Sequence, residues 1–251
     1  MSIHPPCSAC AAGGRRLDAG QGAQPQKKGG GGGGGTVPDT DRKALFCHQC
    51  QPKKSLKVAF YLQATTPVSE DNRFFARIFL LGHNVDLEID TAAGVIPTVY
   101  NEEKKQFAKT ESVADLCDAL KGLEKQGTFP PSSGTLAAVF LPFGKQLRGD
   151  AGDTLGWHIP NVSAKCKDFV DPPLKASRVV VIDSEPETPT PKVLLHEIGH
   201  AVGNVDLGDS AMIMGPANAK GTKEAPIGCQ PDRPDNLMTA TEVEKFCKGS
   251  F

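Results

Sequence analysis

The sequence predicts an α/β (α+β) domain in which helices cover a twisted mixed sheet of about five strands. Between residues 57 and 182, short segments rich in β-branched and aromatic residues are bounded by Gly, Pro, Asn or Asp, as strands are. Segments with apolar residues at helical spacing alternate with them and follow them. This intermixed order is typical of a sheet packed between helices.

The expected elements begin with a strand over residues 57–63 and a helix over residues 69–81. In that helix an apolar stripe is expected to be buried, formed by Phe74, Phe75, Ile78, Phe79 and Leu81. Further strands are expected over residues 84–90, 135–141, 154–159 and 177–182, and further helices over residues 111–123, 191–202 and 241–248.

The folded domain is expected over residues 55–251. Residues 1–54 hold cysteines and a Gly-rich linker with seven consecutive glycines at 29–35. Such a linker buries too little apolar surface to offset the entropy lost on ordering, so it predicts no packed core.

Composition excludes some classes of protein. The formal net charge of −1, with only a mild excess of basic residues before residue 57, argues against a nucleic-acid partner. The sequence contains no run of 18 apolar residues, so no membrane span is expected. Residues 1–11 lack a charged region followed by an apolar one, so no secretory signal is expected, and cytoplasmic location and non-classical export stay open. Oligomeric state is not indicated.

The clearest chemical signal is His196-Glu197-Ile198-Gly199-His200, inside the helix expected over residues 191–202. Residues four apart lie on one helix face, so His196 and His200 can present two imidazoles to one Zn²⁺ ion. Glu197 is then placed to take a proton from a zinc-activated water and to return it to a leaving amine.

Two residues after the motif extend it. Gly203 stands where the helix must stop and turn, and glycine adopts the required positive φ without strain. The turn brings Asp206 back toward the histidines as a third metal ligand, with Asp209 as the alternative.

The stretch His196-Glu-x-x-His200-x-x-Gly203-x-x-Asp206 resembles the metzincin clan of zinc metallopeptidases. Most members have a third histidine where this chain has Asp206, and an aspartate there resembles the snapalysin-type variant. The resemblance implies a zinc-dependent endopeptidase that holds one catalytic Zn²⁺ and acts on a protein or peptide. It also implies two long helices, an active-site helix, and a C-terminal helix after a methionine turn.

Within this resemblance, residues 153–160 look like the edge strand that lies antiparallel to an extended substrate. Unpaired main-chain groups of such a strand bind peptides by β-augmentation. Gly156, Trp157 and His158 are its candidate substrate contacts, although an ordinary edge strand would have the same sequence.

Two methionines compete for the turn beneath the zinc site. Met238 runs directly into the last expected helix, which is the family's order, and is preferred over Met214. With Met238 in the turn, residues 207–234 are an insertion, and a disulfide between Cys229 and Cys247 would bracket the turn.

Four cysteines form two C-x-x-C pairs, Cys7/Cys10 and Cys47/Cys50. Together they would complete a Cys₄ site for a second, structural zinc. Disulfides and unpaired thiols stay open as alternatives. Two other functions also remain: a non-catalytic module in which zinc only braces the fold, and an effector that docks to a partner through its N-terminal cysteine segment.

Overall fold

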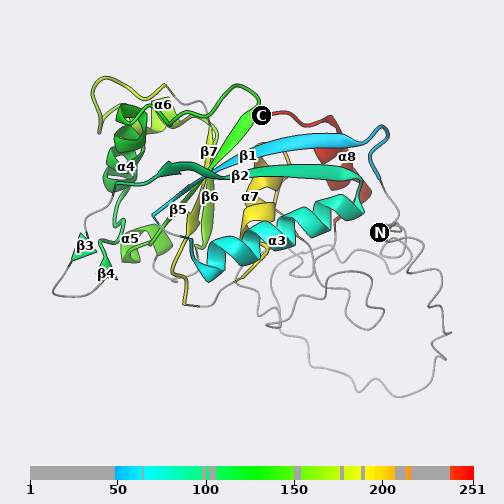
Figure 1. Cartoon of the computed structure of the whole chain (residues 1–251), viewed down its shortest axis with the longest axis horizontal. Coiled ribbons are helices and arrows are strands. Elements are labelled where there is room, and N and C mark those ends of the chain that lie inside the picture. Colours follow the sequence, from blue (N-terminus) through cyan, green and yellow to red (C-terminus); the bar gives the residue numbers. More distant parts are fainter. Residues whose placement is uncertain are drawn as a thin grey trace, which may run out of the picture.

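The computed structural model describes residues 49–63, 65–97, 100–101, 106–149, 154–175, 178–187, 190–206, 213–215 and 238–251. These residues form a mixed α/β fold around one five-stranded sheet (Figure 1).

The sheet has the strand order β2-β1-β5-β7-β6, which confirms the expected mixed sheet. Four strands pair in parallel: β1 (Lys54–Leu62), β2 (Val85–Val95), β5 (Thr135–Leu141) and β7 (Val179–Asp183). The fifth, β6 (Gly156–Ile159), runs antiparallel to β7 and lies at one edge. A separate two-stranded sheet pairs β3 (Tyr100–Asn101) with β4 (Gln106–Phe107).

Helices cover both faces of the large sheet (Figure 1). The first core lies between the sheet and α3 (Pro67–Gly82), α7 (Val193–Ala201) and α8 (Ala240–Lys248). The second core lies between the sheet and α4 (Val113–Lys125) and α6 (Val162–Cys166). A short helix, α5 (Lys145–Arg148), follows β5. None of the helices in the described ranges combines the length and apolarity that crossing a membrane demands.

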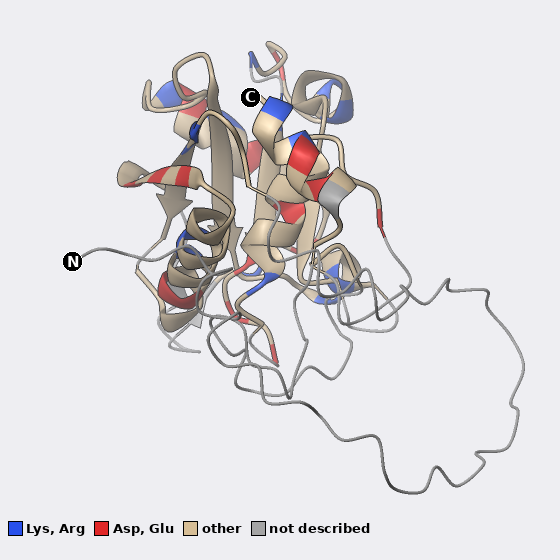
Figure 2. Cartoon of the chain, turned by 90° about the vertical axis from the view of Figure 1, so that its right-hand side faces the viewer, with Lys and Arg blue, Asp and Glu red and all other residues tan. Residues whose placement is uncertain are grey.

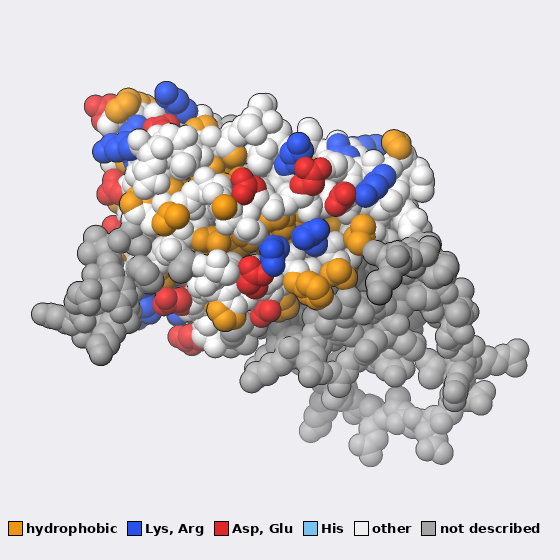
Figure 3. Space-filling view, in the orientation of Figure 1, with side chains coloured by type: hydrophobic (Ala, Val, Ile, Leu, Met, Phe, Trp, Pro, Cys, Tyr) orange, Lys and Arg blue, Asp and Glu red, His pale blue; other side chains and the backbone are white. Residues whose placement is uncertain are grey.

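Charged side chains of both signs are interspersed over the described surface on the face that Figure 3 presents, and residues of both signs also occur along the ribbon in Figure 2. The described part of the face in Figure 3 shows no broad patch of one sign.

The buried face of α3 differs from the expected stripe. The helix begins after the N-cap Thr66, and its buried positions include Asn72, Phe75, Ala76 and Leu80. Phe74 and Leu81 are instead 55% and 36% exposed. The stripe expected from the apolar residues is therefore not the buried face of α3. That face includes a polar residue, Asn72, which the apolar pattern does not indicate.

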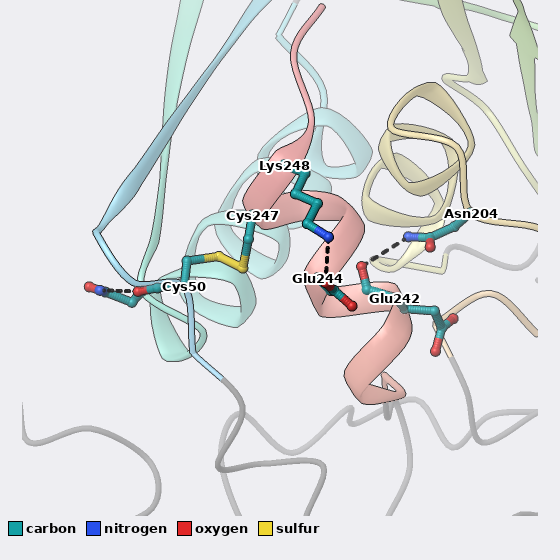
Figure 4. Close-up of a disulfide and its surroundings, with 7 residues drawn as sticks. Cys50, Asn204, Glu242, Glu244, Cys247 and Lys248 are labelled. Carbon is teal, nitrogen blue, oxygen red and sulfur yellow. Dashed lines mark hydrogen bonds and ion pairs between the residues drawn. A yellow bond between two sulfur atoms is a disulfide. The ribbon is translucent and has the colours of Figure 1, made fainter.

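Two disulfides join elements that are distant in sequence. Cys117 of α4 bonds Cys166 of α6. Cys50 bonds Cys247 of α8 and is only 1% exposed in the first core (Figure 4). The folded unit therefore includes residues before 55.

These bonds correct two expectations. Cys50 is not a ligand of a structural zinc, because its sulfur is bonded to Cys247, and for the same reason Cys247 does not pair with Cys229. The short spacing of Cys47 and Cys50 suggested that they act together. In the fold, α8 instead places Cys247 next to Cys50. Cys7, Cys10, Cys47 and Cys229 lie outside the described residues. Disulfides of this kind are typical of proteins that fold in oxidising compartments.

Candidate metal centre

Three side chains converge where the sequence predicted a metal site. His196 and His200 lie on α7, and their Nε2 atoms are 3.2 Å apart. Asp206 Oδ1 lies 3.4 Å from His196 Nε2 and 3.2 Å from His200 Nε2. A tetrahedral zinc with bonds of about 2.0–2.1 Å holds its ligand atoms about 3.3 Å apart. The three atoms therefore have the spacing that one zinc ion requires, and they are the one such group found among the described residues.

Backbone carbonyls orient both imidazoles. His196 Nδ1 lies 2.8 Å from the carbonyl oxygen of Ile213, and His200 Nδ1 lies 3.2 Å from that of Asn204. A carbonyl oxygen only accepts, so each Nδ1 carries the proton and each Nε2 keeps a lone pair for the metal. Burial lowers the pKa of His196, which also favours the neutral, ligating form.

The end of α7 turns as the sequence predicted. Gly203 has φ +94°, a conformation that side-chain-bearing residues rarely adopt. Asn204 N–H then donates to the Gly199 carbonyl at 2.8 Å, and Lys245 of α8 donates to the Gly203 carbonyl at 2.6 Å. The turn directs Asp206 back toward the histidines, and its side chain is 75% exposed against 9% for His196. The site thus opens toward solvent on the Asp206 side.

The start of α7 is held from another helix. Asn72 of α3, only 1% exposed, accepts a 2.8 Å hydrogen bond from Leu194 N–H through its side-chain oxygen. Its amide nitrogen donates to the Val68 carbonyl and, at 3.5 Å, to that of Thr190. The side chain of the N-cap residue, Lys192, does not cap the first turn of α7, so Asn72 supplies the cap from α3. Sequence reasoning missed this role, because Asn72 stands in a polar run, Ser69 to Arg73, that gives no sign of its burial.

Glu197 lies between α7 and the edge strand, with 5% of its surface exposed. Burial and, second, the charge of Asp206 raise its pKa to about 8, while a hydrogen bond from the His158 backbone N–H opposes the rise. A divalent cation held by the triad would also lower this pKa, because opposite charge favours the carboxylate.

Among the described residues, no strand pairs with the outer side of β6, beside Glu197. Asp183 N–H donates to the Leu155 carbonyl, and the antiparallel register continues with Gly156 opposite Ile182 and His158 opposite Val180. Because hydrogen-bonded and non-bonded pairs alternate, the main-chain groups of Gly156 and His158 point away from β7. Because the His158 N–H already donates to Glu197, the groups that the strand offers along its outer side are the N–H and carbonyl of Gly156 and the carbonyl of His158.

Of the three edge-strand residues, Trp157 lies on one face of the sheet, and Gly156 and His158 lie on the other. Trp157 packs against the second core, with Lys165 Nζ 4.8 Å from its ring centroid, so it points away from α7. His158 alternates to the α7 side. Its Nε2 is buried with no hydrogen-bond partner among the described residues. Burial, followed by the charges of His200 and Arg178, lowers its pKa to about 4.

Met214 packs directly against α7, the helix that carries His196 and His200 and is called the metal helix below. A Cβ built on Gly199 would overlap Met214 Sδ, and the preceding residue, Ile213, supplies the carbonyl that orients His196. Met238 is also buried in the first core, with 2% exposed. The contact with the metal helix thus favours Met214, which the sequence reading held as the alternative. Asp209 lies outside the described residues.

Comparison with known proteins adds a distant structural likeness. No family model matches this chain, and no curated protein does. The chain is similar to a solved structure of archaemetzincin (amzA) from Methanopyrus kandleri, with 14% identity and a TM-score of 0.39, over 77% of this chain and 96% of that one. A likeness this distant carries no functional argument.

Proposed function

We propose that this protein is a zinc-dependent endopeptidase. The observation that carries the proposal is the triangle of His196, His200 and Asp206 ligand atoms at 3.2–3.4 Å, with Glu197 adjacent on the same helix. Two neutral imidazoles and one carboxylate suit Zn²⁺ and leave a fourth position for water or substrate, as catalytic zinc sites do.

Zinc, when bound, would act as a Lewis acid that polarises a peptide carbonyl and lowers the pKa of water from 15.7 to about 7. The Glu197 carboxylate accepts the proton of the attacking water and later delivers it to the leaving amine nitrogen. Its burial restricts competing water around the carboxylate. A zinc site that only braced the fold would not need an acid–base group beside its ligands, so Glu197 favours catalysis over a scaffold role.

An extended peptide is the substrate that fits the outer side of β6. The outward N–H and carbonyl of Gly156 and the carbonyl of His158 can pair with such a peptide by β-augmentation. Pairing there would place a peptide bond next to Glu197, because Gly156 packs against the Glu197 side chain.

The test is cleavage of casein and of a fluorogenic peptide library by the zinc-loaded chain and by Glu197→Gln. We expect the wild type to cleave peptides, and the variant to keep its zinc while losing activity by about 10²- to 10⁴-fold, the usual contribution of a general acid–base group. Glu242→Gln is the matched control, because Glu242 is also 5% exposed but lies on α8 and caps that helix. It should retain wild-type activity. A wild-type chain that holds one zinc and cleaves no peptide would refute the proposal.

A further inference from the structure

We propose that Gly156 is a positioning residue for Glu197: the missing side chain on the edge strand creates the space in which the general base lies. The inference rests on the proposed function, because it explains how the base is aligned with a peptide on β6. It gives Gly156 a role distinct from main-chain pairing with substrate.

The contact is close enough that a side chain at this position would force its neighbours to shift. A Cβ on Gly156 would lie 2.7 Å from Glu197 Oε1 and 2.8 Å from Glu197 Cγ. It would also lie 2.7 Å from Val193 Cγ1. Separations under 3.0 Å are essentially never found for a Cβ, so the neighbours would have to shift. Gly156 is not in the positive-φ region, so what the site uses is its lack of a side chain.

Packing around Glu197 holds its backbone in place, so only its side chain can move. Its helix, α7, is buried along most of its length and packs against β6 and β7. Val193, one turn earlier, contacts the same glycine. A methyl group at position 156 would therefore displace the carboxylate more readily than the helix. The displaced oxygen would leave the outer side of β6, where the peptide bond is expected.

The experiment compares Gly156→Ala with Gly94→Ala. Gly94 is a matched control in the opposite edge strand, β2: its Cβ would lie 2.8 Å from Thr128 Oγ1 and 2.8 Å from Tyr61 Cδ1, remote from the metal site. We expect both variants to lower Tm by about 5 °C, since overpacking strains either site, and both to keep one zinc per chain. In Gly156→Ala alone, kcat should fall by about 10- to 100-fold, because a shift of about 1 Å misaligns the base. KM should stay within about threefold of wild type, because the main-chain edge is unchanged.

A second measurement does not depend on activity. In metal-free protein, the Tm loss caused by Gly156→Ala should shrink by about half or more when Glu197 is replaced by Ala, because the overlap with Cγ and Oε1 is gone. The Tm loss that remains is the part caused by overlap with Val193 Cγ1. The loss caused by Gly94→Ala should be the same in both backgrounds.

The outcomes separate the two proposals. An equal Tm loss for Gly156→Ala in both backgrounds overturns the positioning role. So does an unchanged kcat in Gly156→Ala. A chain that shows the coupling in Tm but cleaves no peptide, even as zinc-loaded wild type, overturns the endopeptidase proposal and with it the catalytic meaning of the contact.

Discussion

Replacing Asn72 by alanine removes the hydrogen bond that caps the metal helix from α3. Leu194 N–H is fully buried and loses its 2.8 Å acceptor. An unsatisfied buried donor costs about 1–3 kcal/mol, and loss of a cap costs about 0.5–2 kcal/mol. We therefore expect the free energy of unfolding to fall by about 2 kcal/mol and Tm by about 4–8 °C. Zinc affinity should fall too, because His196 lies in the first turn and a half of that helix.

Urea unfolding, calorimetry and zinc titration measure these effects. Asp71→Ala is the control, since Asp71 is exposed on the same helix and its loss should change Tm by less than about 1 °C. Asn72→Asp should also lower Tm, because its carboxylate keeps the acceptor for Leu194 N–H but loses the donor to the Val68 carbonyl and buries a charge. If Asn72→Ala melts within 1 °C of the wild type, the capping argument is wrong.

Three further results are expected. Chelation of zinc should lower Tm reversibly, and Asp206→Ala should lower zinc occupancy, both checked by metal analysis; unchanged occupancy would place the third ligand elsewhere. Gly203→Ala should cost about 1–2 kcal/mol, because its φ of +94° disfavours a side chain, and should weaken zinc binding. The control Gly134→Ala, at φ +81° in open space, should cost a similar stability without changing zinc affinity. Replacing Cys50 and Cys247 by serine should lower the free energy of unfolding, measured in urea, by up to about 5 kcal/mol. The reason is that the bond closes a loop with a sequence separation of 197. A decrease below about 1 kcal/mol would contradict the loop-entropy reasoning.

Local patterns predicted most of the fold. The strand expected over residues 135–141 matches β5, and the helix expected over residues 191–202 contains α7. Both succeed because each is a mainly apolar segment with clear limits: Gly134 and Pro142 bound the strand, and Pro191 and Gly203 bound the helix. The short elements β3, β4, α5 and α6 were missed, since two to five residues carry too little periodicity to stand out.

The candidate site divides in the same way. His196, Glu197, His200, Gly203 and Asp206 could be identified from sequence, because helix periodicity and one glycine turn place them together within eleven residues. That reasoning is local, and the distances among the ligand atoms agree with it.

Only the tertiary structure decided the contacts made by residues distant in sequence. Asn72 reaches the start of α7 across a separation of 122 residues, and Cys50 reaches Cys247 across 197. Gly156 meets Glu197 only because β6 pairs with β7 in one register, a pairing that no local pattern specifies. The sequence identified the candidate residues for holding zinc and for moving a proton. Packing determined which neighbours hold those residues in place, because such contacts depend on how separate elements meet in space.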